Sequence, residues 1–172
     1  MASISEKMQD ALNGQINAEM YSTNLYLAMA AYFDALDLPG FAHWMQVQAK
    51  EENLHVGKLF DYISERGGRV VIKAVEAPPV EWESPLAAFE ATYNHEEEIT
   101  AMVSDLVGLS HSEHDRATES FLRWFVDEQV EEEANVDRVV KMLRLGDGQP
   151  VAMLMLDREM AARPEAPAVA PA

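Results

Sequence analysis

Four long stretches of the chain carry apolar side chains at alternating steps of three and four residues, and this pattern most constrains the fold. A helix with this pattern has one apolar edge, and four such helices bury their edges by packing around a common axis. The sequence therefore predicts an all-α protein built on a four-helix bundle. The first of the four edges reads Met8, Leu12, Gln15, Glu19, Ser22, Tyr26, Met29 and Phe33.

Turn and capping residues divide the chain into five predicted helices. Ser3-x-x-Glu6 and Ser110-x-x-Glu113 have the form of capping boxes, which would start the first and fourth helices. Pro39 suits the first turn of a helix, and Gly67-Gly68 suits a left-handed C-terminal cap. The predicted helices cover residues 3–36, 39–66, 85–110, 110–146 and 150–162, the last of them being a short fifth helix.

The connection between the second and third helices is long, and it contains Pro78-Pro79. We predict an extended crossover over residues 67–83, which returns the chain to its starting end and makes these two helices parallel. Residues 1–162 would then form one domain. The Pro/Ala-rich tail over residues 163–172 is expected to be disordered.

Each apolar edge becomes polar at the middle of its helix, where Glu19, Glu52, Glu96 and Gln129 stand. Glu19 and Glu52 are 33 positions apart (52 − 19), as are Glu96 and Gln129 (129 − 96). Several carboxylates buried in one layer without a counter-charge cost several kcal/mol per ion or become protonated. The layer therefore favours a bound cation, with a purely structural, hydrogen-bonded polar layer as the alternative.

The Glu52-x-x-His55 spacing points two ligands to one face of the second helix. Oxygen donors with one imidazole suit iron or manganese. Glu52 can bridge two ions, and His55 can bind one of them. In the second half, Gln129 is neutral and Glu132 stands where a symmetric centre would have histidine. Unequal ligand sets suggest a site that admits and releases iron.

Net charge and cysteine content exclude several classes of partner and of metal site. The chain has 30 acidic and 13 basic side chains, a net charge of −17, so it should repel nucleic acid and anionic membranes and attract cations. It contains no cysteine, which excludes disulfides and thiolate metal sites. No apolar run approaches the ~20 residues of a membrane span. A cytoplasmic location is the simplest expectation.

Four segments, residues 17–22, 50–55, 93–96 and 121–133, closely resemble prokaryotic non-haem ferritins, and the likeness continues to about Met160. The resemblance implies a ferritin-like fold and a di-iron ferroxidase centre. Glu19, Glu52 and His55 would bind one iron, and Glu52, Glu96 and Gln129 would bind the other. A third iron site would use the acidic residues Glu51, Glu128, Glu131 and Glu132.

Two further residues bear on the site. Tyr26 resembles the tyrosine beside the ferritin centre, where it would bond a ligand or donate an electron, although core packing explains it equally well. Asn53 stands where bacterioferritins have a haem-ligating methionine, so no haem is expected.

The resemblance also implies the activity and the assembly. O2 or H2O2 would oxidise Fe(II), and a homo-oligomeric shell, usually of 24 subunits in this family, would store hydrated ferric oxide. The alternatives are a di-iron peroxidase that stores no iron and a structural bundle with a polar core layer.

Overall fold

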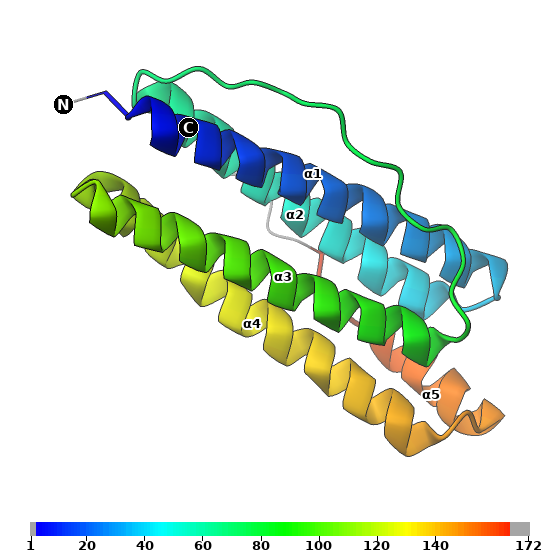
Figure 1. The fold of residues 1–172 in the computed structure, drawn as a ribbon. Coiled ribbons are helices and arrows are strands. Elements are labelled where there is room, and N and C mark those ends of the chain that lie inside the picture. Colours follow the sequence, from blue (N-terminus) through cyan, green and yellow to red (C-terminus); the bar gives the residue numbers. More distant parts are fainter. Residues whose placement is uncertain (1–2, 166–172) are drawn as a thin grey trace.

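The computed structural model describes residues 3–165, and its helices form one elongated bundle (Figure 1). The helices are α1 Glu6–Ala35, α2 Pro39–Glu65, α3 Pro85–Ser112, α4 Arg116–Gly146 and the short α5 Pro150–Met160. The described residues contain no strand. The predicted all-α bundle with a fifth helix is therefore confirmed. Within residues 3–165, no helix is both long and apolar enough to cross a membrane.

Helices α1 and α2 form one antiparallel pair, and α3 and α4 form another (Figure 1). The connection over residues 66–84 returns along α1 to the end of the bundle where α1 ended, so α2 and α3 run parallel, as predicted. Asn13 on α1 accepts a hydrogen bond from the Val71 N–H at 2.8 Å and donates one to the Arg69 carbonyl at 3.0 Å. These side-chain bonds replace the backbone partners that an extended segment outside a sheet lacks.

Two of the predicted helix caps are wrong. Ser5, rather than Ser3, caps α1, because its hydroxyl accepts a hydrogen bond from the Met8 N–H at 3.0 Å. Asp115, rather than Ser110, caps α4. The Asp115 carboxylate accepts from the Thr118 N–H in the first turn of α4 and also pairs with Arg66, the residue that follows α2, 3.1 Å away. Serine and aspartate are both among the residue types preferred at helix N-caps.

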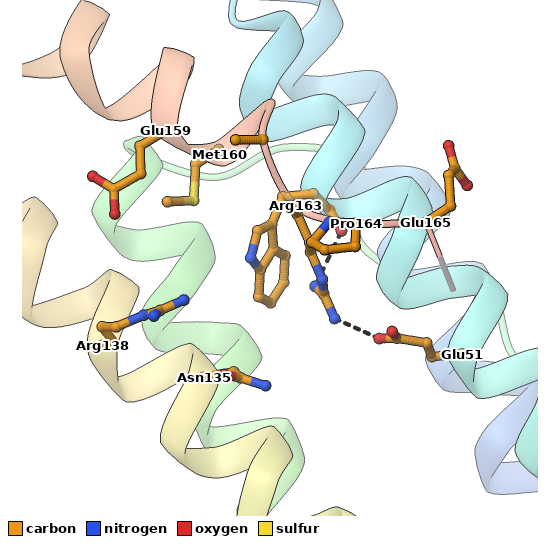
Figure 2. Close-up of a pocket in the computed structure, with 10 residues that line it drawn as sticks. Glu51, Asn135, Arg138, Glu159, Met160, Arg163, Pro164 and Glu165 are labelled. Carbon is orange, nitrogen blue, oxygen red and sulfur yellow. Dashed lines mark hydrogen bonds and ion pairs between the residues drawn. The ribbon is translucent and has the colours of Figure 1, made fainter. Parts of the chain in front are cut away.

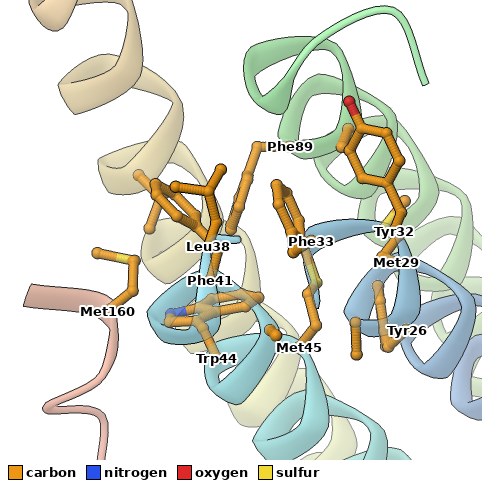
Figure 3. Close-up of a cluster of buried hydrophobic side chains, with 14 of the residues drawn as sticks. Tyr26, Met29, Tyr32, Phe33, Leu38, Phe41, Trp44, Met45, Phe89 and Met160 are labelled. Atoms are coloured by element: carbon orange, nitrogen blue, oxygen red, sulfur yellow. The ribbon is translucent and has the colours of Figure 1, made fainter. Parts of the chain in front are cut away.

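The core consists of two apolar clusters with a polar layer between them. One cluster lies toward α5, where stacked and edge-on aromatic rings fill the bundle (Figure 3). Its largest fully buried side chains are Tyr26, Met29, Phe33, Phe41, Met45 and Phe89. The other cluster lies toward the start of α1 and includes Met8, Leu12, Leu59, Ile63, Leu122 and Phe125. The burial pattern agrees with the predicted one of apolar ends and polar midpoints.

Helix α5 docks across the start of α2 through a close contact at Gly40. The carboxylate of Asp157 accepts hydrogen bonds from the N–H groups of Gly40 and Phe41, at 2.8 and 3.1 Å. A Cβ atom on Gly40 would lie 1.7 Å from the Asp157 carbonyl oxygen, so only glycine fits. The predicted tail beyond α5 is described only as far as Glu165, and residues 166–172 lie outside the described residues.

Candidate metal centre

Glu19 of α1 meets Glu52 and His55 of α2 in the middle of the bundle. One possible ligand atom from each residue lies within 4.8 Å of the other two. His55 Nδ1 is 3.1 Å from Glu52 Oε2 and 3.7 Å from Glu19 Oε2. All three side chains are buried, with at most 2% of any residue exposed. The structure therefore brings together the three residues that the sequence assigns to the first ion.

Two atoms of this group are buried with no hydrogen-bond partner in residues 3–165, namely Glu19 Oε2 and His55 Nδ1. Buried polar atoms almost always have a partner, so such atoms require an explanation. The other oxygen of Glu19 accepts from Gln15 at 2.8 Å, and Glu52 Oε1 accepts from Gln48 at 3.1 Å. Each carboxylate is thus held through one oxygen while the other faces the centre, which is how outer residues orient metal ligands.

Glu96 of α3 and Gln129 of α4 form the opposite side of the same buried layer. The Glu96 carboxylate accepts hydrogen bonds from the Tyr26 hydroxyl and from Gln129 Nε2, the latter at 3.2 Å. Gln129 also donates to Thr100 Oγ1 at 3.3 Å. Tyr26 is therefore both a core residue and a bonded neighbour of a predicted ligand.

A second group of possible ligands consists of His55, Glu128 and Glu132, again within 4.8 Å of one another. Glu132 is buried and accepts from Gln48 at 2.7 Å, whereas Glu128 is half-buried. These residues line a groove of about 720 Å³ that leads outward from the centre. The other predicted third-site residues, Glu51 and Glu131, line the same groove.

The four third-site residues are not equivalent. Glu128 and Glu132 face His55, whereas Glu51 forms an ion pair with Arg163, and Glu131 is exposed to solvent. The structure therefore brings two of the four together and gives a third one a different partner.

Two carboxylates of the layer, those of Glu52 and Glu96, retain protons more strongly than free ones. Burial, with repulsion from Glu132, raises the pKa of Glu96 to about 7. Burial also raises the pKa of Glu52 well above its ordinary value; the contact with His55 opposes this rise, and repulsion from Glu96 and Glu19 adds to it. A divalent ion would supply the missing positive charge, and its binding would release these protons.

His55 carries part of that positive charge in the absence of metal. Burial lowers the pKa of His55, but its contacts with Glu19 and Glu52 raise it well above the ordinary value. Burial would raise the pKa of Glu19, and the contact with His55 lowers it below its usual range instead. The same imidazole must lose its proton before it can bind a metal.

Sequence reasoning assigned no role to Gln15, Gln48 or Arg163. Gln15 and Gln48 each stand four residues before a predicted ligand, on the same edge of the helix, and this spacing could have indicated them. Arg163 lies in the predicted tail, and no sequence signal connects it with the centre. Trp124 packs edge-on against His55, with ring centroids 5.4 Å apart.

A four-helix bundle with one long crossover, and with buried glutamates around a histidine in its core, defines a metal-binding protein of the carboxylate class. Sequence comparison agrees with this class. The sequence profile of the ferritin family, described as a ferritin-like domain, matches residues 9–145. The chain belongs to the ferritin family.

Individual relatives cover almost the whole chain. It is 46% identical to a bacterial non-heme ferritin of Bacteroides fragilis over 145 residues, or 84% of this chain and 91% of the relative. It is 40% identical to one from Staphylococcus saprophyticus, over 93% of this chain and 96% of the relative. It is 55% identical to the open pore ferritin of Archaeoglobus fulgidus, whose crystal structure aligns with a TM-score of 0.93 over 94% of this chain and 100% of that one.

Proposed function

We propose that this chain is the subunit of an iron-storage ferritin that oxidises Fe(II) to Fe(III) at a di-iron centre in the middle of the bundle. Glu19, Glu52 and His55 would bind one ion. Glu52, Glu96 and Gln129 would bind the other, with Glu52 between the two. The product would pass into an oligomeric shell and be stored as hydrated ferric oxide.

One observation carries this proposal: Glu19 Oε2 and His55 Nδ1 are buried side by side with no hydrogen-bond partner in the described chain. A polar layer that served only to fix the register of the helices would satisfy its own buried atoms. A carboxylate oxygen and an imidazole nitrogen without hydrogen bonds are instead available to bind a metal ion. The presence of only one histidine among several carboxylates favours iron over zinc.

The chemistry balances with iron as the substrate. Each Fe(II) gives up one electron, so a pair reduces O2 and two protons to H2O2, or reduces H2O2 and two protons to two molecules of water. The residues of this chain hold the ions and move protons. Gln15 and Gln48 orient the carboxylates, and His55 and Glu96 release protons when metal binds. Tyr26, bonded to Glu96, would hold that carboxylate in position.

The wider assignments follow from family membership. We expect a homo-oligomeric shell, with 24 subunits as the usual number, and a cytoplasmic location. We expect no haem, since Asn53 replaces the methionine that would bind it. A third iron would bind in the acidic groove beside His55, near Glu51, Glu128, Glu131 and Glu132. The acidic surface of the chain would attract Fe(II).

The proposal is tested by adding Fe(II) aerobically to the metal-free protein while recording ferric absorbance and particle size. We expect rapid oxidation and iron that stays with a shell-sized particle. Replacing both Glu52→Gln and His55→Ala should remove rapid oxidation and leave the particle size unchanged. Glu98→Gln, on the exposed face of α3, is the matched control and should keep the wild-type rate.

Three results would contradict the proposal. A monomer with no oxidation above the buffer rate would exclude storage. Normal oxidation in the double variant would place the centre elsewhere. Consumption of H2O2 with no iron retained by the particle would favour the peroxidase alternative.

A further inference from the structure

The segment that follows α5 lies along α2 and reaches the metal centre. We call residues 161–165 the arm. The arm is held by its backbone, because the Arg163 carbonyl lies 2.9 Å from His43 Nε2. Lys50 of α2 forms an ion pair with Glu165 at 2.5 Å. Figure 2 shows the arm and the side chain of Arg163, which points from the arm toward Glu51.

The guanidinium of Arg163 is bound on several sides. It lies over the ring of Trp44, 4.1 Å from the centroid, and donates to the Trp44 carbonyl at 3.3 Å. It also donates to Gln48 Oε1 at 2.8 Å and forms an ion pair with Glu51 (Figure 2). Only 14% of the side chain is exposed. An arginine held by a ring, an amide and a carboxylate is a built site rather than a chance surface contact.

A single residue, Gln48, connects this arginine with the predicted ligands of the centre. Gln48, whose oxygen accepts from Arg163, donates through its nitrogen to Glu52 at 3.1 Å and to Glu132 at 2.7 Å. Arg163 therefore fixes which end of the Gln48 amide faces the carboxylates. Arg163 and Glu51 also both line the groove that contains His55, Glu128 and Glu132.

We propose that Arg163 is a tethered cation that occupies the Glu51 corner of this groove and thereby weakens the binding of a third metal ion there. This inference rests on the proposed function. A metal ion that uses Glu51 must displace the guanidinium, since one carboxylate cannot serve both cations at close range without their mutual repulsion. The paired centre deeper in the bundle does not use Glu51. Arg163 would therefore separate two tightly bound ions from a third that passes through.

The competition has a reciprocal consequence. If the docked arm weakens binding of the third ion, the third ion must loosen the arm by the same factor. Iron that reaches Glu51 would displace the Arg163 guanidinium from that carboxylate and so loosen the arm, which His43 and Lys50 still hold to α2. The Arg163 guanidinium and the third ion would therefore bind the Glu51 carboxylate in turn.

The test uses the whole assembled protein and anaerobic Fe(II), with binding followed by calorimetry. Arg163→Gln should bind the third ion about tenfold more tightly than the wild type, the size of effect typical of residues just outside a metal's ligands. Arg163→Lys keeps the charge but loses the stacking on Trp44, so its affinity for the third ion should lie between those of the wild type and Arg163→Gln. Arg138→Gln is the matched control. Arg138 lines a second pocket, which Glu51 and Arg163 also line, and it forms no ion pair with any described residue.

Two further measurements separate competition from a merely structural role of the arm. The double variant Arg163→Gln, Glu51→Gln should lose the gain in affinity, because the carboxylate under competition is gone. In the wild type, saturating Fe(II) should speed amide hydrogen exchange over residues 161–165. In Arg163→Gln, that exchange should already be fast without metal.

The outcomes distinguish the two proposals. If the wild type binds no Fe(II), the proposed function fails, and the inference fails with it. If the wild type binds the paired ions while Arg163→Gln shows an unchanged third affinity, only the role of Arg163 is overturned. A gain that persists without Glu51, or an equal gain in Arg138→Gln, would also overturn it.

Discussion

His55 is the residue on which the two groups of the centre converge. Its ring lies against Glu19 and Glu52 on one side and belongs to the group with Glu128 and Glu132 on the other. Removing it would therefore affect both groups of possible metal ligands. The edge-on ring of Trp124 holds the imidazole in place, so the histidine is positioned by packing as well as by charge.

The raised pKa of Glu96 predicts how metal binding depends on pH. Its pKa is raised to about 7, so below that pH it holds a proton which an incoming ion must displace, and above it the carboxylate is already free. Fe(II) affinity should therefore fall as pH is lowered through about 7, by roughly tenfold per pH unit for each proton displaced. Titrations between pH 8 and 6, with proton release measured by an indicator, check this.

The control for this prediction is on the same helix. Glu96→Gln should remove the part of the pH dependence centred near 7, and Glu97→Gln, at an exposed position, should leave it intact. An affinity that is flat from pH 8 to 6 would contradict the role given to Glu96.

Single residues were predictable where they followed the helical period. Glu19, Glu52 and Glu96 stand on edges whose other residues are apolar, and a carboxylate at such a position cannot avoid burial. Arg163 follows no such period. Its position depends on how α5 docks, which is a tertiary property that the local sequence does not contain.

At the scale of helices, the contact between α5 and α2 depends on Gly40. Gly40→Ala should destabilise the protein by about 2 kcal/mol, because the added methyl must displace the Asp157 carbonyl from a tightly packed contact. In Gly57→Ala, on the exposed face of the same helix, nothing lies within 4 Å of the added atom. That variant should gain about 1 kcal/mol, since alanine favours helix over glycine.

Denaturant unfolding of the two alanine variants measures both effects. Opposite changes in the free energy of unfolding are the expected result. Equal gains in the two variants would show that α5 is not held against the start of α2 as described.

Helix bounds illustrate what local pattern can and cannot determine. Proline at the first turn of α2, and the left-handed Gly67 after α2, follow directly from backbone geometry and were predicted. The caps of α1 and α4 were not, because more than one capping residue stands near each start: Ser3 and Ser5 before α1, and Ser110, Ser112 and Asp115 before α4. At α4, Asp115 pairs with Arg66, which follows α2 and is distant in the sequence, so local pattern could not indicate it.

For the whole molecule, the polar layer means that metal should stabilise the fold. Without metal, the layer holds Glu52 and Glu96 with raised pKa values and two buried atoms that lack partners. An ion that binds only the folded state adds about 2.7 kcal/mol at one hundred times its Kd. Thermal unfolding of the metal-free protein should therefore shift upward on adding anaerobic Fe(II).

The double variant Glu52→Gln, His55→Ala provides the comparison. It should show little or no shift on adding metal. An upward shift as large as in the wild type would mean that the stabilising ions bind elsewhere, for example at the acidic surface.

The polar layer between the two apolar clusters reflects a trade-off between the stability of the fold and its function. A bundle of this length could be filled from end to end with leucine and phenylalanine, and such replacements of buried charges often make proteins sturdier. This chain keeps a weak cross-section at its centre, where carboxylates crowd around one imidazole. A variant in which apolar residues replaced this layer would be expected to withstand heat better and to bind no iron. The residues that give the protein its function are those that destabilise the metal-free fold.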